Sequence, residues 1–556
     1  MIEQTIKTQN IQLQPEQMKN QAQNSQKIVP EQIYPIQLKQ KTVVIIGCTY
    51  AGTMLAVTLR KVEPETRIII FDRNSYTSFL ACGIHLAVNR TCIDQTRMFY
   101  NTAENLRNMG MEVYTDCYVD NVDFDRNFVN ATINDQNTQF QYSKVVIATG
   151  AEPLVPPVIS HINYLERVPK QIRQSFKRIH VCKNYTDSLK LADLKPCKIC
   201  IVGTGLIGME MAWAFHEVGF DITILSHSEH ILHDMLQLEY IEVLEKMVKE
   251  LKIEVVQKSR IVKMWENKLE VNVVVEKIVQ DQEINLQFKF DHVILCAGFV
   301  PNTKNILNNK FIQQQTQIKQ NRGAIITDLS RKTSHPDVYA IGDCSLTRSF
   351  LLNSDMYLPL STNAIRSAFI VAYDINGQKL RYKGTNQTRA VQLFGYSFGT
   401  TGFDETSANK YFKHVNRTLY SDYLYHRYCN KKIEKVVQHN KLSSKFDIYG
   451  DIVRGLADQV VESFDLDVDE QDDQIVSVSI CFDKQTLKIL GAQCMGKQDI
   501  TQQMNAVSVA ICQSITLDEL AQIDFGGYCG EEKPWNVLQA AASLQCMEMV
   551  DFEGQM

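Results

Sequence analysis

Two short glycine-rich segments have the composition of turns that bind the phosphates of a dinucleotide. The first, GCTYAG from Gly47 to Gly52, keeps the outer glycines of the pattern GxGxxG and has Thr49 in place of the middle one. The second, GTGLIGME from Gly203 to Glu210, fits the pattern completely. In such turns the glycines allow a tight bend, and backbone N–H groups approach a pyrophosphate at a helix N-terminus. A structural βα turn without a ligand is the alternative for the first segment.

The residues that follow each turn suggest how a ribose would be bound. Asp72 stands 25 residues after Gly47, where an acidic side chain can accept hydrogen bonds from ribose hydroxyls. In the second segment Ser226 and His227 occupy the place where an NAD site usually has an acid. The choice between NADH and NADPH therefore stays open at this point.

Both turns lie between elements that would position them. TVVIIG from Thr42, a helical stretch over 51–62 and RIIIFD form one strand, helix, strand unit. KICIVG, a helical stretch over 206–218 and DITIL repeat it. Such βαβ units require parallel sheets, so we expect an α/β protein with two Rossmann-like dinucleotide-binding domains.

Composition excludes several other classes of protein. The chain has 556 residues and a formal charge of −5, from 58 basic and 63 acidic groups. This balance argues against a general nucleic-acid binder, and no stretch has the uninterrupted apolar length of a membrane span. Fifteen scattered cysteines indicate a reducing compartment, and Cys197 and Cys200 are expected to be packed in a strand. The acidic run at 465–473 lacks the spacing of a calcium loop, so no metal site is expected.

The first forty residues are rich in Gln and Asn and contain few large apolar groups. Such a segment cannot bury enough surface to offset its chain entropy, so residues 1–40 are expected to be a disordered tail. The tail contains three glutamates and no arginine, unlike a mitochondrial presequence. A cytoplasmic location is therefore expected.

A third element carries a family resemblance. In TSHPDVYAIGDC, residues 333–344, a strand delivers Gly342 and Asp343 into a turn. Together with ATG at 148–150 and the two glycine-rich turns, this AIGD segment resembles the flavin- and nicotinamide-dependent disulfide reductase superfamily. The resemblance implies FAD and NADH or NADPH as cofactors, and it places Asp343 on the FAD ribitol. The residues it implies for binding the two cofactors are Gly47, Thr49, Ala51, Gly52, Asp72, Thr149, Gly150, Gly203, Gly205, Gly208, Glu210, Gly298, Gly342, Asp343 and Thr362.

The branch of the superfamily is indicated near the expected flavin. Dithiol members use CxxxxC, but Ala87 stands five residues after Cys82. SFLACGI at 78–84 and CAGFVPNT at 296–303 resemble water-forming NADH oxidases, NADH peroxidases and coenzyme A disulfide reductases. PLSTNAIR at 359–366, ILGAQ at 489–493 and KPWN at 533–536 extend the resemblance into a third domain, which in that family forms the dimer interface.

This resemblance implies a catalytic residue and an activity. The expected enzyme passes hydride from NAD(P)H to FAD and then reduces oxygen, with Cys82 cycling between thiolate and sulfenic acid so that water is the product. Tyr50 stands where such enzymes commonly have a proton-handling histidine. His85, three residues after Cys82, is a candidate to compensate, although a histidine near a core is more often simply packed. Leu206 stands where they often place a tyrosine over the flavin. A buried, inert Cys82 is the structural alternative.

Two other functions are compatible with the same residues. One is an NAD(P)H-dependent coenzyme A disulfide, polysulfide or peroxide reductase, and the other is a flavoprotein sensor with slow turnover. The expected domains are a discontinuous FAD-binding domain at 41–155 and 285–380, an NAD(P)H-binding domain at 156–284, and a C-terminal α+β dimerisation domain at 381–556. Small-molecule substrates, a homodimer, and no nucleic-acid or membrane partner complete the expectation.

Overall fold

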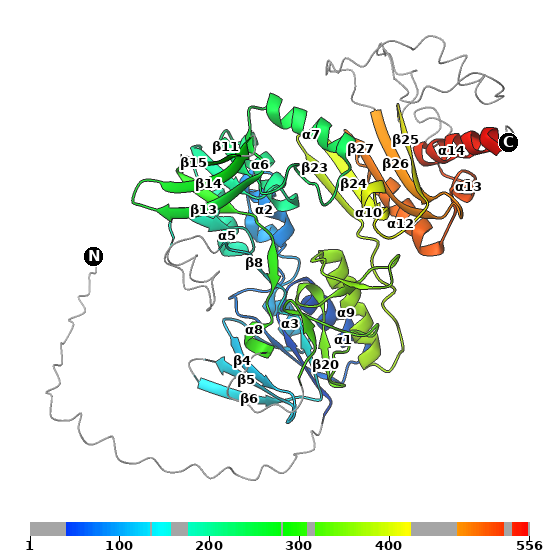
Figure 1. The fold of residues 1–556 in the computed structure, drawn as a ribbon. Coiled ribbons are helices and arrows are strands. Elements are labelled where there is room, and N and C mark those ends of the chain that lie inside the picture. The colour runs from blue at the N-terminus through cyan, green and yellow to red at the C-terminus, as the bar shows by residue number, and fades with distance from the viewer. Residues whose placement is uncertain are drawn as a thin grey trace, which may run out of the picture. The chain divides into compact units, whose positions relative to one another are not determined.

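The fold is described from a computed structural model of the chain, which covers residues 40–133, 136–156, 176–279, 282–307, 317–423, 475–526 and 536–553 (Figure 1). Gln40–Met556 forms a compact unit of its own. The tail expected at residues 1–40 lies outside the described residues apart from Gln40, as does the acidic run at 465–473.

The first sheet is parallel and has the strand order β20-β7-β1-β2-β3. Every residue of its central strand, TVVII, is buried, as expected for a parallel sheet that is covered on both faces. On one face α1 and α9 pack together around Leu55, Ala368 and Val371. An antiparallel meander of β4, β5 and β6 contributes to the core on the other face. The bounds are β1 Thr42–Ile46, α1 Tyr50–Val62, β2 Arg67–Phe71, β3 Glu112–Tyr114, β4 Tyr118–Asp123, β5 Phe128–Ile133, β6 Gln136–Gln141, β7 Lys144–Ile147, β20 Val338–Ala340 and α9 Ser361–Ile375.

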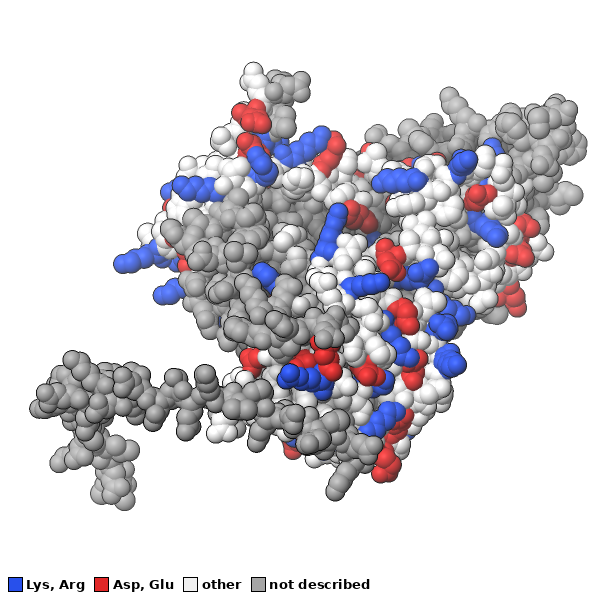
Figure 2. Space-filling model, turned by 60° about the horizontal axis from the view of Figure 1, so that its bottom comes forward, with Lys and Arg blue, Asp and Glu red and all other residues white. Residues whose placement is uncertain are grey.

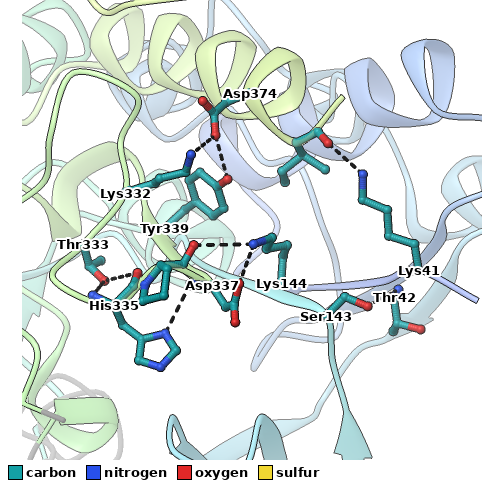
Figure 3. A network of polar contacts seen from close by, with 12 residues as sticks. Lys41, Thr42, Ser143, Lys144, Lys332, Thr333, His335, Asp337, Tyr339 and Asp374 are labelled. Atoms are coloured by element: carbon teal, nitrogen blue, oxygen red, sulfur yellow. Dashed lines mark hydrogen bonds and ion pairs between the residues drawn. The ribbon is translucent and has the colours of Figure 1, made fainter. Parts of the chain in front are cut away.

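Polar contacts stabilise the second piece of this domain and also join it to the first (Figure 3). The Lys332 ammonium lies 2.6 Å from the Asp374 carboxylate, and the Tyr339 hydroxyl donates to the same carboxylate at 2.7 Å. Lys144 at the start of β7 forms an ion pair with Asp337 just before β20. The contact between Lys144 and Asp337 joins residues 193 positions apart in the sequence, so the first sheet is built from two separated pieces of the chain.

The second sheet is also parallel, with the order β12-β11-β10-β16-β9. Helices α5, α6 and α7 and a three-stranded antiparallel sheet of β13, β14 and β15 belong to the same part of the chain. The bounds are β9 Ile179–Val181, α5 Tyr185–Ala192, β10 Lys198–Val202, α6 Leu206–Glu217, β11 Asp221–Leu225, α7 Leu238–Glu250, β12 Glu254–Val256, β13 Ser259–Glu266, β14 Val271–Val279, β15 Gln282–Phe290 and β16 His292–Leu295.

The topology moves the boundary expected at residue 284. That boundary would cut β15, which stays paired with β14 to its end, where Phe290 faces Val271. The next strand, β16, pairs in parallel with β10, with His292 beside Ile199. The second domain therefore extends to Leu295, because the strand that completes its sheet comes after the hairpin rather than before it. The chain passes from the first domain to the second through β8 (Ala151–Pro153) and returns through β17 (Phe299–Pro301), and these two strands pair antiparallel.

The third sheet is antiparallel, with the order β23-β24-β27-β26-β25, and helices pack on it. The α/β class with two Rossmann-like domains and a C-terminal α+β domain is thus confirmed. The elements of this C-terminal domain are β23 Arg389–Leu393, β24 Tyr396–Gly402, α10 Glu405–Ala408, β25 Val415–Tyr423, β26 Ile475–Asp483, β27 Ile489–Gly496, α12 Thr501–Gln513, α13 Leu517–Leu520 and α14 Val537–Glu553. The shorter elements are η2 Ala81–Gly83, α2 Ile84–Val88, η3 Gln95–Met98, α3 Ala103–Asn108, α8 Lys304–Leu307, β18 Gln320–Asn321, β19 Ala324–Ile325, η4 Gly342–Cys344, β21 Thr347–Arg348 and β22 Asp355–Met356.

The surface has no strong excess of one charge on the face drawn in Figure 2, where basic and acidic side chains are interspersed. Within the described ranges no helix combines the length and the apolar character that crossing a membrane requires.

Candidate active site

The first glycine-rich turn follows β1 and passes close to the end of β7. Gly47 has φ +100°, and a Cβ added there would lie 2.3 Å from the backbone oxygen of Ala148. A Cβ at Gly52 would lie 1.9 Å from the Gly47 oxygen. Only glycine fits these two positions, whereas Thr49 at the middle position forms the N-cap of α1. As at any helix N-terminus, the first N–H groups of α1 have no partner within the helix and could bind a ligand.

Asp72 directly follows β2 and lies against this turn. Its Oδ2 accepts the backbone N–H of Cys48 at 2.7 Å, and its Oδ1 accepts the backbone N–H of Asn74 at 2.9 Å. Burial raises the pKa of the Asp72 carboxyl, and these hydrogen bonds oppose that rise. The carboxylate is therefore fixed where a ribose hydroxyl could donate to it.

The AIGD turn, which follows β20, packs against the same helix. Gly342 has φ +70°, and a Cβ added to it would lie 3.2 Å from the Cβ of Ala51 and 3.4 Å from that of Ala364. This close approach puts Asp343 beside the N-terminus of α1. Thr362 is exposed in the first turn of α9, close to the same place.

Polar groups around Asp343 extend the site toward the second domain. The Lys183 ammonium, from the loop after β9, lies 3.8 Å from the Asp343 carboxylate. The backbone N–H of Asn302 donates to the Gly150 oxygen at 2.9 Å, and the Asn302 side chain donates to the Thr149 oxygen at 3.3 Å. The segments after β7, β17 and β20 thus converge at one edge of the first sheet.

The second glycine-rich turn repeats the geometry of the first. A Cβ at Gly203, which has φ +113°, would lie 2.4 Å from the Cys296 oxygen, and one at Gly208 would lie 2.1 Å from the Gly203 oxygen. Gly205 is exposed and forms the N-cap of α6. The second turn is therefore also shaped for a close approach of a ligand to the backbone.

Glu210 lies near Cys296, which directly follows β16 of the second sheet, and Gly298 is two residues farther along the chain. Burial raises the pKa of Glu210 to about 7 and that of Cys296 to about 12. Gly298 has φ +106° and accepts the backbone N–H of Leu154 at 2.8 Å. Leu206, at the start of α6, is partly buried and packs against the hydrophobic core.

Cys82 is exposed and lies in the 3₁₀ turn η2, directly before the five-residue helix α2. The Tyr50 hydroxyl lies 2.9 Å from the Cys82 sulfur. The Tyr50 ring stacks on Tyr100 with a centroid separation of 5.6 Å. Burial and the neighbouring Cys82 raise the pKa of the Tyr50 phenol, so it stays protonated at neutral pH. Tyr50 can therefore donate a hydrogen bond to a thiolate, but it cannot serve as a base.

The loop that carries Cys82 is fixed to the first glycine-rich turn. Ser78, which has φ +59°, donates its backbone N–H to the Cys48 oxygen at 2.8 Å. Its hydroxyl lies 2.8 Å from the Thr53 hydroxyl of α1. The redox candidate is thus positioned by the same elements that form the nucleotide turn.

His85 lies beside the Cys82 backbone. Its ring bonds the Cys82 backbone, and burial lowers the pKa of the imidazole. His85 is therefore neutral at pH 7 and supports the turn, whereas Tyr50 contacts the sulfur. Cys200 is buried in β10 and Cys197 is partly buried next to it, as expected for packed strand cysteines. In the described part of the chain no cluster of three His, Cys, Asp or Glu side chains could hold a metal ion.

The comparison with known families agrees with this arrangement. Residues 41–368 match the model of the pyridine nucleotide-disulphide oxidoreductase family. The chain belongs to this family. The superfamily assignment made from the sequence is confirmed, and so are the expectation of an enzyme of the oxidoreductase class and the expectation of a flavin and a pyridine nucleotide as its cofactors.

Several relatives of this oxidoreductase cover nearly the whole chain. An NADH oxidase of Enterococcus faecalis is 29% identical over 91% of this chain and 100% of its own length. The water-forming NADH oxidase of Lactobacillus brevis, solved with NADH, is 23% identical with a TM-score of 0.75, covering 92% of this chain and 99% of that one. An engineered water-forming NADPH oxidase derived from it, solved with NADPH, has a TM-score of 0.76 at 24% identity and the same two coverages. These structures share the fold of this oxidoreductase.

The first domain of this oxidoreductase fits FAD in ways that its motifs do not reveal. The Tyr357 hydroxyl is buried and has no hydrogen-bond partner in the described residues, and burial together with Asp343 raises its pKa. The glycine-rich turn, the hydrogen-bonded Asp72 carboxylate and the unpaired Tyr357 hydroxyl suit a large polar ligand. Neither Tyr357 nor Lys183 belongs to a sequence motif, so only the tertiary contacts reveal them.

Proposed function

We propose that this oxidoreductase is a FAD-dependent NAD(P)H oxidase that reduces oxygen to water with Cys82 as its only redox cysteine. The observation that carries the proposal is the exposed Cys82 sulfur, 2.9 Å from the Tyr50 hydroxyl and fixed to the first nucleotide turn. The Cys48 thiol of that turn is buried, and burial raises its pKa to about 12, so it is a poor second partner.

The first domain would hold FAD through Asp72, Asp343 and the turn at Gly47–Gly52. When bound there, FAD supplies the two-electron chemistry that accepts hydride from a nicotinamide and delivers electrons to oxygen. The second domain would hold NAD(P)H through the turn at Gly203–Gly208, with Glu210 and Gly298 next to the nicotinamide end. The paired strands β8 and β17 connect the two sites covalently and by hydrogen bonds.

Cys82 accounts for the step from peroxide to water. Its thiolate attacks one oxygen of hydrogen peroxide, so that an S–O bond forms, the O–O bond breaks and water leaves. The hydride equivalent of a second NAD(P)H and one proton then supply the two electrons and two protons that return the sulfenic acid to the thiol and release a second water. Tyr50 supports both steps, because its hydroxyl donates a hydrogen bond to the thiolate and then to the sulfenate oxygen.

The stoichiometry of the purified, FAD-loaded enzyme tests the proposal. We expect two NAD(P)H to be consumed per oxygen without free peroxide, and one NAD(P)H per oxygen with peroxide as a full product in Cys82→Ser. The exposed Cys512→Ser variant is the matched control and should keep the native ratio. Stoichiometric peroxide from the native enzyme would contradict a water-forming oxidase.

A reductase of coenzyme A disulfide, polysulfide or peroxide is the second candidate. The exposure of Cys82 favours it, because an accessible thiolate can also attack a disulfide sulfur and form a mixed disulfide. Turnover with these acceptors under nitrogen, at rates above those with air, would support the reductase in place of the oxidase.

We further propose that the protein acts as a homodimer through its third domain, 381–556, and works in the cytoplasm. The family resemblance of the segments at 359–366 and 489–493 supports the dimer. The free thiols of all cysteines in the described ranges support a reducing compartment. Light scattering of the purified protein and microscopy of a fluorescent fusion test these two statements.

A further inference from the structure

The first βαβ unit, with its turn at Gly47–Gly52, can be compared position by position with the second, with its turn at Gly203–Gly208. In the first unit the backbone N–H of Gly47 donates to the oxygen of Phe71, the last residue of β2, at 2.7 Å. In the second unit Gly203 donates in the same way to Leu225, the last residue of β11, at 2.9 Å. The residue after each strand therefore occupies an equivalent position. That residue is Asp72 in the first unit and Ser226 in the second.

These two residues offer opposite chemistry to a ribose. The Asp72 carboxylate lies against its glycine-rich turn and can accept from both ribose hydroxyls. Ser226 is 1% exposed, and its hydroxyl lies 2.8 Å from the hydroxyl of Thr204, inside the second turn. A serine carries no charge and cannot replace the two acceptor oxygens of a carboxylate. It also does not repel a phosphate on the 2′ position.

The groups next to Ser226 are suited to an anion. The hydroxyl of Ser228 lies 3.4 Å from the ring Nε2 of His233, and His227 is exposed between the two serines. The backbone N–H of Lys258 donates to the Ser228 oxygen at 3.1 Å, which holds the lysine at this edge. Hydroxyl, imidazole and ammonium groups are all donors to phosphate oxygens.

Two carboxylates at this edge are already paired. The Lys258 ammonium lies 2.5 Å from Glu229, and His233 lies 3.1 Å from Asp234. All four side chains are about half exposed or more, and exposed ion pairs contribute little. A bound phosphate could therefore replace Glu229 as the partner of Lys258 and Asp234 as the partner of His233, and the two carboxylates would then be solvated by water.

We propose that the second site of this protein selects NADPH over NADH, with Ser226 as the specificity-determining residue and Ser228 and Lys258 as ligands of the 2′-phosphate. This inference rests on the proposed function only in so far as the second domain binds the reducing nucleotide. It separates the chain from relatives whose names specify NADH.

The first test measures selectivity in the native enzyme. We expect kcat/KM to be at least tenfold higher for NADPH than for NADH, and 2′,5′-ADP to bind at least tenfold more tightly than 5′-AMP by calorimetry. Both nucleotides are assayed with oxygen and, under nitrogen, with ferricyanide. Failure with oxygen alone would contradict the oxidase and leave the selectivity measurable. Equal or tighter binding of 5′-AMP would overturn the inference.

The second test uses variants. Ser226→Asp should lower kcat/KM for NADPH at least tenfold and raise it for NADH, and Lys258→Ala should weaken 2′,5′-ADP about threefold to tenfold without changing 5′-AMP. Lys249→Ala removes the same charge from the exposed face of α7 and should change neither. If Ser226→Asp does not fold, the Lys258 variant and the ratio of the native affinities for 2′,5′-ADP and 5′-AMP still test the proposal. An unchanged ratio in both variants would overturn the assignment.

Discussion

At the scale of single residues, the contact between Tyr50 and Cys82 is the feature that most distinguishes this site. The resemblance implies a histidine partner where this chain has Tyr50, and from the sequence His85 is either a compensating group or a packed histidine. In the structure Tyr50 contacts the sulfur and His85 contacts the backbone. A phenol whose pKa is raised stays neutral over the working range of pH, so this partner donates a hydrogen bond but does not titrate.

Removing the Tyr50 hydroxyl tests this role. We expect Tyr50→Phe to slow reduction of added peroxide about tenfold and to release free peroxide, because a hydrogen bond to a charged group contributes about 1.5–3 kcal/mol. The measurement is peroxide yield per NAD(P)H together with the rate of sulfenic acid formation. Tyr100→Phe, which keeps the ring stacked on Tyr50, is the control and should retain water as the product. Native behaviour of the Tyr50 variant would contradict the proposed role.

The buried Glu210 carboxyl should make the stability of the protein depend on pH. Burial raises its pKa from 4.5 to about 7. Between these two values the unfolded chain has lost the proton and the folded protein keeps it, so the contribution of Glu210 to stability falls as pH rises and is constant above about pH 7. Glu210→Gln should therefore match the native protein near pH 4.5 and be more stable by up to about 3 kcal/mol above pH 7.

Chemical unfolding of both proteins at several pH values from 5 to 8 measures this difference. Glu217→Gln, the same change on the same helix, controls for the loss of a carboxylate as such. A difference for Glu210→Gln that does not depend on pH would show that this carboxyl is not held protonated by the fold.

At the scale of elements, the motifs predicted the two βαβ units because their glycines and buried strands are local in sequence. The turn at 47–52, the helix after it and β2 all lie close to their expected places. The boundary at 284 could not be predicted, since the pairing of β16 with β10 joins strands separated by about 90 residues. Lys183 and Tyr357 were missed for the same reason, because their neighbours come from distant segments.

Two glycines with similar backbone angles separate conformational strain from steric fit. Gly47 has φ +100° and Gly110 has φ +79°, but an added Cβ clashes with Ala148 only at Gly47, whereas it meets nothing within 4 Å at Gly110. Gly110→Ala should cost about 1–2 kcal/mol of stability. Gly47→Ala should cost clearly more and abolish retention of FAD, as measured by the flavin absorbance after gel filtration and by thermal unfolding. Equal effects of the two changes would contradict the close approach of the turn to β7.

At the scale of the whole molecule, the second and third domains share a polar contact through Gln493, the last residue of the ILGAQ segment. Gln493 of β27 is 2% exposed, and its side chain accepts the backbone N–H of Gln237 at 2.8 Å and donates to the Met235 oxygen at 3.2 Å. The Tyr240 hydroxyl of α7 lies 3.2 Å from that of Ser477 in the same sheet. The segment that leads into α7 is therefore bonded to the C-terminal sheet, which couples the nucleotide domain to the domain proposed for dimerisation.

Breaking this coupling should change how the protein unfolds. Gln493→Ala leaves two buried backbone groups without partners, which costs about 1–3 kcal/mol. Because that cost falls on the contact between two domains, we expect the calorimetric transition of the full chain to broaden or split, with the second domain melting first and NADP⁺ restoring a single transition. Gln392→Ala, an exposed change on β23 of the same sheet, should leave the transition unchanged. A single transition shifted without broadening would mean that Gln493 contributes to the stability of one cooperative unit and does not couple two separable domains.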